Sequence, residues 1–148
     1  LIPLEWSDEF RTGIAELDAD HRILVALIGK CQTLIVKGEG REEVASLLSE
    51  LIEYTAYHFK REELVMELCQ YPDITVHRGV HQQLIGQLER HVSLFGEGTL
   101  SPNALLTLLH HWLTSHIQGI DRDIAPYCQS KDELLRSELA TLAPPPIS

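Results

Sequence analysis

The sequence contains no long apolar run. Within its 148 residues no stretch approaches the roughly 18 apolar residues of a membrane-spanning helix, and the first residues do not resemble a signal peptide. Positive charge is also scarce: 12 Lys and Arg stand against 22 Asp and Glu, and the net charge of -10 repels nucleic acid and anionic membrane surfaces. We therefore expect a soluble, cytoplasmic protein that binds no nucleic acid and does not insert into a membrane.

Cysteine is rare as well. Cys31, Cys69 and Cys128 are odd in number, lie far apart in the chain and form no C-x-x-C pair. This pattern argues against a disulfide framework and against a thiolate zinc site. We expect the three side chains to pack as small hydrophobic residues, and the cytoplasm is the default compartment.

The sequence also lacks the sustained alternation of apolar and polar residues that is typical of a β-sheet. Instead, apolar residues recur at helical spacing, which predicts an all-α domain. The expected helices run from the cap Asp18 to before Gly38, from about Arg41 to Leu68 before Pro72, from about Thr75 to Phe95, and from Pro102, capped by Ser101, to about Gln118. Short connections favour an antiparallel up-down-up-down four-helix bundle.

The two ends of the chain differ from this bundle. The first residues, with Pro3, Trp6 and Gly13, form a loop-like N-terminal arm, and residues 1–130 make up one domain. Residues 131–148 are expected to form a short C-terminal helix, from Lys131 to Leu142, followed by the proline run 144–146. That run resembles a linker, which favours a domain within a larger protein, with a C-terminal effector as its partner.

Residues that can bind a metal are spaced along the expected helices. His58 and Glu62 are four residues apart, as are His77 and His81, so each pair projects from one face of its helix. His116 and Asp121 are five residues apart, about 140° around a regular helix, and they converge only if the helix loosens near Gly119.

The positions along each helix give an independent test. His21 lies at the start of the first expected helix, and the pair His58 and Glu62 lies near the end of the second. The pair His77 and His81 lies at the start of the third helix, and the pair His116 and Asp121 lies at the end of the fourth. In an antiparallel bundle these places lie at the same level. The sequence therefore predicts one metal site inside the bundle.

The motifs around these positions are more specific than their spacing. The chain reads D-A-D-H up to His21, H-F-K-R-E over 58–62, H-R-G-V-H over 77–81 and H-I-Q-G-I-D over 116–121. This set resembles the signature of the hemerythrin family, and in particular its bacteriohemerythrins, over roughly residues 6–128. The tail beyond about Ser130 is unusual for the family.

The resemblance implies a di-iron centre with an oxo or hydroxo bridge. His77, His81 and His116 would bind one iron, His21 and His58 the other, and Glu62 and Asp121 would bridge both. One position would stay open, on the iron held by His21 and His58, for dioxygen. The side chains expected to line this oxygen pocket are Leu24, Phe59, Trp112, Leu113 and Ile117, although residues at such spacing are usually ordinary core.

Three functions remain open at this point. A reversible oxygen carrier or store is favoured, an oxygen or redox sensor domain of a larger signalling protein is the alternative, and a di-iron oxidase or peroxidase is third. We expect no enzyme, because di-iron enzymes on a bundle scaffold use Glu-x-x-His repeats and this chain has none. Histidine and carboxylate ligands suit iron, although affinity alone does not exclude zinc, copper or manganese.

The other histidines have no family position. His91, His110 and His111 are expected to face solvent or to pack, and Asp18 is expected to cap a helix rather than to bind metal.

Overall fold

A computed structural model describes residues 5–38, 40–116 and 121–147, without the side chains of Leu113 and Asp121. Regular structure in these residues is entirely helical, which confirms the predicted all-α class. The elements are η1 (Asp8–Phe10), α1 (Ala15–Val36), α2 (Arg41–Leu68), α3 (Ile74–Gly96), α4 (Pro102–Ser115), η3 (Asp121–Cys128) and α5 (Asp132–Leu139).

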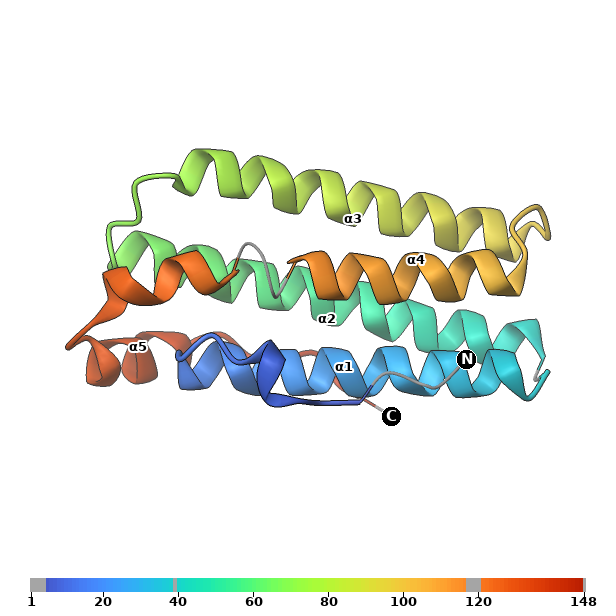
Figure 1. Cartoon of the computed structure of the whole chain (residues 1–148), viewed down its shortest axis with the longest axis horizontal. Helices are drawn as coiled ribbons and strands as arrows, with labels where there is room; N and C mark the ends of the chain where they lie inside the picture. Colours follow the sequence, from blue (N-terminus) through green and yellow to red (C-terminus); the bar gives the residue numbers. More distant parts are fainter. Residues whose placement is uncertain (1–4, 39, 117–120, 148) are drawn as a thin grey trace.

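The helices α1 to α4 alternate in direction along one long axis (Figure 1). Each packs against its neighbour in the chain, and α4 closes the ring on α1. This is the predicted antiparallel up-down-up-down four-helix bundle. The short helix α5 lies at the end of the bundle where α1 begins, against α1 and α2 (Figure 1). No helix in the described ranges is both long enough and apolar enough to cross a membrane.

Local capping residues set two of the predicted helix limits. The Ser101 hydroxyl accepts a hydrogen bond from the Ala104 amide at 3.1 Å, so Ser101 caps α4 as predicted. The helix α2 ends at Leu68 because Gln70, with a φ of 55°, adopts the left-handed conformation. The Gln70 and Tyr71 amides then donate to the carbonyls of Glu67 and Met66, which closes the helix before Pro72 is reached.

The start of α1 differs from the prediction. The helix begins at Ala15, and Asp18 lies inside its first turns instead of capping it. The buried Asp18 carboxylate accepts hydrogen bonds from the Thr12 amide at 2.7 Å, the Thr12 hydroxyl at 2.8 Å and the Gly13 amide at 3.3 Å. Asp18 therefore fastens the N-terminal arm to α1, because those amides precede the helix and need an acceptor.

The expectation for the cysteines was correct for Cys31 and wrong for the other two. Cys31 is fully buried in the main hydrophobic core. This core consists of Phe10, Leu24, Val25, Leu27, Ile28, Cys31, Val44, Leu48, Leu51, Tyr54, Phe59, Leu88, Phe95, Leu105, Leu109 and Trp112. Cys69 and Cys128 form a disulfide between residues 59 apart in the chain, with a Cα–Cα distance of 5.1 Å. They meet because the end of α2 and η3 share a second apolar cluster, the α5-end cluster, which consists of Ile14, Leu17, Val65, Met66, Cys69, Ile124, Cys128, Leu135 and Leu139.

The C-terminal helix exists but is shorter than expected. It spans Asp132–Leu139, and its apolar residues Leu135 and Leu139 are almost fully buried in the α5-end cluster. Leu142 lies beyond the helix, where its carbonyl accepts a hydrogen bond from the Tyr57 hydroxyl at 3.4 Å. The tail after α5 thus returns along α2 before it reaches the proline run. The role of residues 131–148 as a linker stays a prediction.

Candidate metal centre

The alternating helices bring six of the predicted ligand residues to one level of the bundle. His21 lies early in α1, His58 and Glu62 late in α2, His77 and His81 early in α3, and His116 directly after α4. Each is buried, with at most 3% of its surface exposed. Asp121 is the first residue of η3, but its side chain lies outside the described part of the chain, as does Gly119.

The Glu62 carboxylate lies at the centre of this group. Its Oε1 is 2.6 Å from His77 Nε2, 2.8 Å from His81 Nε2 and 3.8 Å from His116 Nε2. Its Oε2 is 3.1 Å from His58 Nε2, which in turn is 3.1 Å from His21 Nε2. Two groups that could each hold a metal ion therefore share Glu62: one adds His77, His81 and His116, and the other adds His21 and His58.

Two of the imidazoles are oriented by further carboxylates. His58 Nδ1 lies 3.0 Å from Asp20 Oδ2, and His81 Nδ1 lies 2.9 Å from Glu63 Oε2. A ring N–H that donates to such a carboxylate leaves the Nε2 lone pair for a metal. In both rings Nε2 is the atom that faces Glu62.

Each of these close contacts needs a proton or a metal ion between its two atoms. A lone pair on Nε2 and a carboxylate oxygen repel each other at less than about 3 Å unless a proton or a metal ion lies between them. Neutral imidazoles around an anionic carboxylate form a donor set that a divalent transition metal accepts. The residues present therefore fit a metal centre.

The charge of Glu62 follows from its surroundings. Without a metal, protons occupy the ring nitrogens that face Glu62. Burial alone would raise the pKa of Glu62, but hydrogen bonds from His58, His77 and His81 and the charge of His116 then outweigh burial and hold this pKa well below its usual value. The carboxylate is therefore anionic, as a bridging ligand must be.

Aromatic residues close one side of the cluster. The Phe59 ring stacks on His81 with centroids 3.8 Å apart, and the Trp112 ring lies nearly parallel to His116 at 6.3 Å. Both belong to the main core, together with Leu24, which is 1% exposed. The side chains of Leu113 and Ile117 lie outside the described residues. The assignment of these residues to an oxygen pocket stays a prediction.

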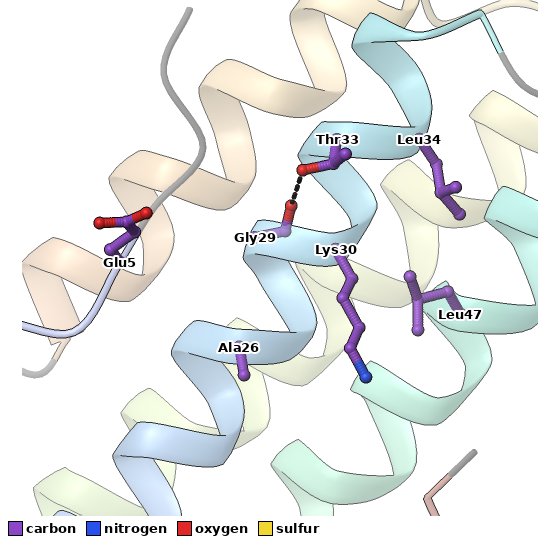
Figure 2. A pocket seen from close by; sticks show the side chains of 7 residues that line it. All are labelled: Glu5, Ala26, Gly29, Lys30, Thr33, Leu34 and Leu47. Atoms are coloured by element: carbon purple, nitrogen blue, oxygen red, sulfur yellow. Dashed lines mark hydrogen bonds between the residues drawn. The ribbon is translucent and has the colours of Figure 1, made fainter.

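The remaining histidines lie away from the cluster, as expected. His110 and His111 are exposed on α4, and His91 is half-buried on α3, where its Nδ1 lies 2.7 Å from the Gln87 carbonyl. A separate surface cavity of about 450 Å³ lies beside α1 and α2, lined by Glu5, Ala26, Gly29, Lys30, Thr33, Leu34 and Leu47 (Figure 2). None of its lining residues was predicted to bind metal or oxygen.

The sequence patterns did not indicate Asp20, Arg61 and Glu63, which lie beside the candidate ligands. All three lie within or beside the motifs that drew attention to His21 and Glu62. A usable signal existed for Arg61, because it is three residues after His58 and so shares its helix face. Which carboxylate pairs with which histidine depends on contacts between helices.

The bundle and its buried histidine and carboxylate cluster define a helical protein able to bind metal. Residues 12–128 match the family model described as the hemerythrin HHE cation binding domain. The chain belongs to the hemerythrin family.

Similar proteins agree with this assignment. The chain is 30% identical to a bacteriohemerythrin of Stenotrophomonas maltophilia over 82% of this chain and 79% of that protein. It is 28% identical to a myohemerythrin of Riftia pachyptila, over 80% of this chain and 88% of that one. A crystal structure of wild-type hemerythrin superposes with a TM-score of 0.75 at 28% identity and covers 83% of this chain and 95% of its own. The family match, residues 12–128, spans the chain from the start of α1 to the end of η3.

Proposed function

We propose that this protein binds dioxygen reversibly at a non-haem di-iron centre, as an oxygen carrier or store. The observation that carries the proposal is the buried Glu62 carboxylate, which is shared by two histidine groups that could each hold a metal. Membership of the hemerythrin family supports a di-iron, oxygen-binding fold. The names bacteriohemerythrin and myohemerythrin among its relatives agree with that role.

The ligand assignment follows the two groups. His77, His81 and His116 would hold one iron, His21 and His58 the other, and Glu62 would be shared by both. Asp121, whose side chain lies outside the described part of the chain, would be the second shared ligand, as the family motif implies. The bound iron pair would supply the redox chemistry and the open position that dioxygen needs. The protein orients His58 and His81 through Asp20 and Glu63. Phe59 and Trp112 would close one side of the cluster with apolar surfaces that exclude water, and Leu24 belongs to the same core.

The ligand types favour binding over catalysis. Glu62 is the one carboxylate in the two described metal-binding groups, and the other members are histidines. Di-iron enzymes built on helical bundles use a more carboxylate-rich site with Glu-x-x-His repeats, which this sequence lacks. We therefore propose a binding protein in preference to a di-iron oxidase or peroxidase.

Metal analysis tests the proposal. Protein expressed in iron-replete medium is expected to hold about two iron atoms per chain, and its absorption spectrum is expected to change reversibly when the reduced protein meets air. Glu62→Ala removes the shared ligand and is expected to lose both irons, whereas His91→Ala, at a half-buried histidine outside the cluster, is expected to keep them. Stoichiometric zinc without iron, or equal iron loss in the two variants, would contradict the proposal.

A second candidate is an oxygen or redox sensor domain. It is favoured by the direct contact between Arg61, three residues after His58, and the last residue of α5. A sensor needs a structural element whose free energy differs between two states, and α5 is placed to be that element.

A further inference from the structure

Each of the two metal-binding groups has a histidine that contacts a carboxylate and, through it, an arginine. In one group His58 contacts Asp20, which pairs with Arg61 at 2.9 Å. In the other, His81 contacts Glu63, which pairs with Arg78 at 3.2 Å. The two histidine–carboxylate–arginine series share the same chemistry but differ in burial: the Arg61 side chain is 11% exposed and the Arg78 side chain is 40% exposed.

In the buried series, His58–Asp20–Arg61, both carboxylate oxygens of Asp20 face donors. Asp20 is 3% exposed, and its Oδ2 faces both His58 Nδ1 and Arg61 Nε, while its Oδ1 lies 3.5 Å from the Tyr54 hydroxyl. Removing one member would leave a buried charge without its partner, which is far more costly than the loss of a surface pair. His58, Asp20 and Arg61 therefore hold one another in place.

Arg61 connects the buried series to the C-terminal helix α5. Its Nη1 donates to the Leu139 carbonyl at 3.1 Å, and its Nη2 lies 3.5 Å from the Glu16 carbonyl. Leu139 is the last residue of α5, where carbonyl groups have no partner within the helix. One guanidinium thus contacts the carboxylate that orients His58 and also caps α5.

The apolar contacts of α5 lie next to the Arg61 contact. Leu135 and Leu139 bury α5 in the α5-end cluster against Val65 and Met66, one turn beyond Arg61 and Glu62 on α2. The docking of α5 and the placement of Arg61 are therefore mutually dependent.

We propose that Asp20 and Arg61 are positioning residues that couple metal binding at the His21–His58 pair to the docking of α5 on the bundle. The inference rests on the proposed function for the presence of metal at that pair. Metal bound there fixes the His58 ring, which fixes Asp20 and Arg61 and so stabilises the hydrogen bond to Leu139. By reciprocity, a docked α5 strengthens metal binding by the same factor.

Hydrogen exchange of the whole protein, with and without ferrous iron under anaerobic conditions, tests the coupling. In the wild type, iron is expected to slow exchange of the α5 amides by about fivefold or more, the lower end of typical coupling between sites. In Arg61→Met this difference is expected to vanish at α5, while iron still slows exchange near the ligands in α3. A side chain with a purely structural role would shift the iron-free and iron-bound rates alike and preserve their difference.

Arg78→Met is the matched control, because it removes the arginine of the equivalent but exposed series, His81–Glu63–Arg78, which does not reach α5. It is expected to keep the iron-dependent change at α5. Release of iron to a chelator gives the reciprocal measurement: Asp20→Asn and Arg61→Met are expected to weaken one of the two irons by about 10- to 100-fold, and Arg78→Met to have little effect.

The outcomes separate this inference from the proposed function. A wild type that takes up no iron overturns both. Two bound irons with no change at α5, or the same response in Arg61→Met and Arg78→Met, overturn the coupling alone. If circular dichroism shows that Arg61→Met does not fold, Asp20→Asn, which keeps the volume of the side chain, is judged by the same criteria.

Discussion

At the scale of single residues, two buried carboxylates, Asp18 and Asp20, are each matched to nitrogen or hydroxyl donors. Asp18 accepts from Thr12 and Gly13, and Asp20 faces His58 and Arg61. Burying an anion without such partners would cost several kcal/mol, so each carboxylate specifies which segments meet around it. The structural role of Asp18 is to fasten the arm, because its acceptors point back toward the residues before α1.

Asp18→Ala is expected to lower the free energy of unfolding by about 1 to 3 kcal/mol, because the Thr12 amide and hydroxyl lose their acceptor while buried. Urea unfolding followed by circular dichroism measures the change. Asp8→Ala, at an exposed position of the same arm, is expected to stay within about 0.5 kcal/mol of the wild type. Equal effects of the two substitutions would show that the Asp18 contacts contribute nothing.

Burial, followed by the negative charge of Glu50, raises the pKa of the Cys31 thiol to about 12. Because its folded pKa lies above the unfolded value of 9.0, Cys31 favours the folded state fully below pH 9, and this contribution falls away as pH rises toward about 12. Native protein at pH 8 is therefore expected to resist alkylation by iodoacetamide at Cys31. Mass spectrometry checks this, with labelling after denaturation as the control; rapid labelling of the folded protein would contradict it.

At the scale of secondary-structure elements, sequence patterns predicted those helix limits that depend on residues close together in the chain. The limits of α2 and the cap of α4 were predicted because helical periodicity, Ser101 and Pro102 act within a few residues. The start of α1 was placed too late because an Asp before an apolar helical pattern is typical of a helix cap. The hydrogen-bond partners of Asp18 lie instead in the preceding arm. The disulfide was missed because Cys69 and Cys128 meet only once η3 returns to the end of α2.

The Cys69–Cys128 bond closes a loop between residues 59 apart, for which the chain-entropy model gives about 4 kcal/mol of stabilisation. Reduction, or Cys69→Ala with Cys128→Ala, is expected to lower the free energy of unfolding by about 2 to 5 kcal/mol in urea titrations. Cys31→Ser keeps the bond and should still show the difference between reduced and oxidised protein. Identical unfolding with and without reductant would mean that the bond does not form.

This bond also bears on the compartment. Stable disulfides are rare in reducing compartments, so the pairing of Cys69 with Cys128 weighs against the cytoplasm that the sequence favoured by default.

At the scale of the whole molecule, the topology is what turns separate motifs into one centre. The predicted ligand residues were expected to meet because antiparallel helices place the start of one beside the end of the next, and those whose side chains are described do lie at one level. The pairing of Asp20 with His58 and of Glu63 with His81 was not predicted, because it depends on how two helices are rotated against each other, and no spacing in the sequence reports that rotation. Periodicity therefore places a site along a helix but does not pair its members.

The bundle is also expected to protect a reduced iron centre from water along its apolar core. Leu24 lies three residues after His21 on α1 and is 1% exposed within the main core. Leu24→Ala is expected to cost about 2 to 5 kcal/mol and to open space beside the His21–His58 pair. Polar species that enter this space would speed the loss of bound dioxygen as peroxide, which takes two electrons from the iron pair and leaves the di-ferric form, because apolar walls no longer oppose their entry.

Leu48→Ala is the matched control, since Leu48 is equally buried in the same core but lies near the start of α2, well before His58 and Glu62 in that helix. Spectral decay of the oxygenated protein, measured together with iron content, compares the two variants. Both are expected to lose similar stability and to retain iron, but only Leu24→Ala should oxidise faster than the wild type. Equal oxidation rates would mean that Leu24 is ordinary core and that the oxygen pocket lies elsewhere, because stability alone would then account for both variants.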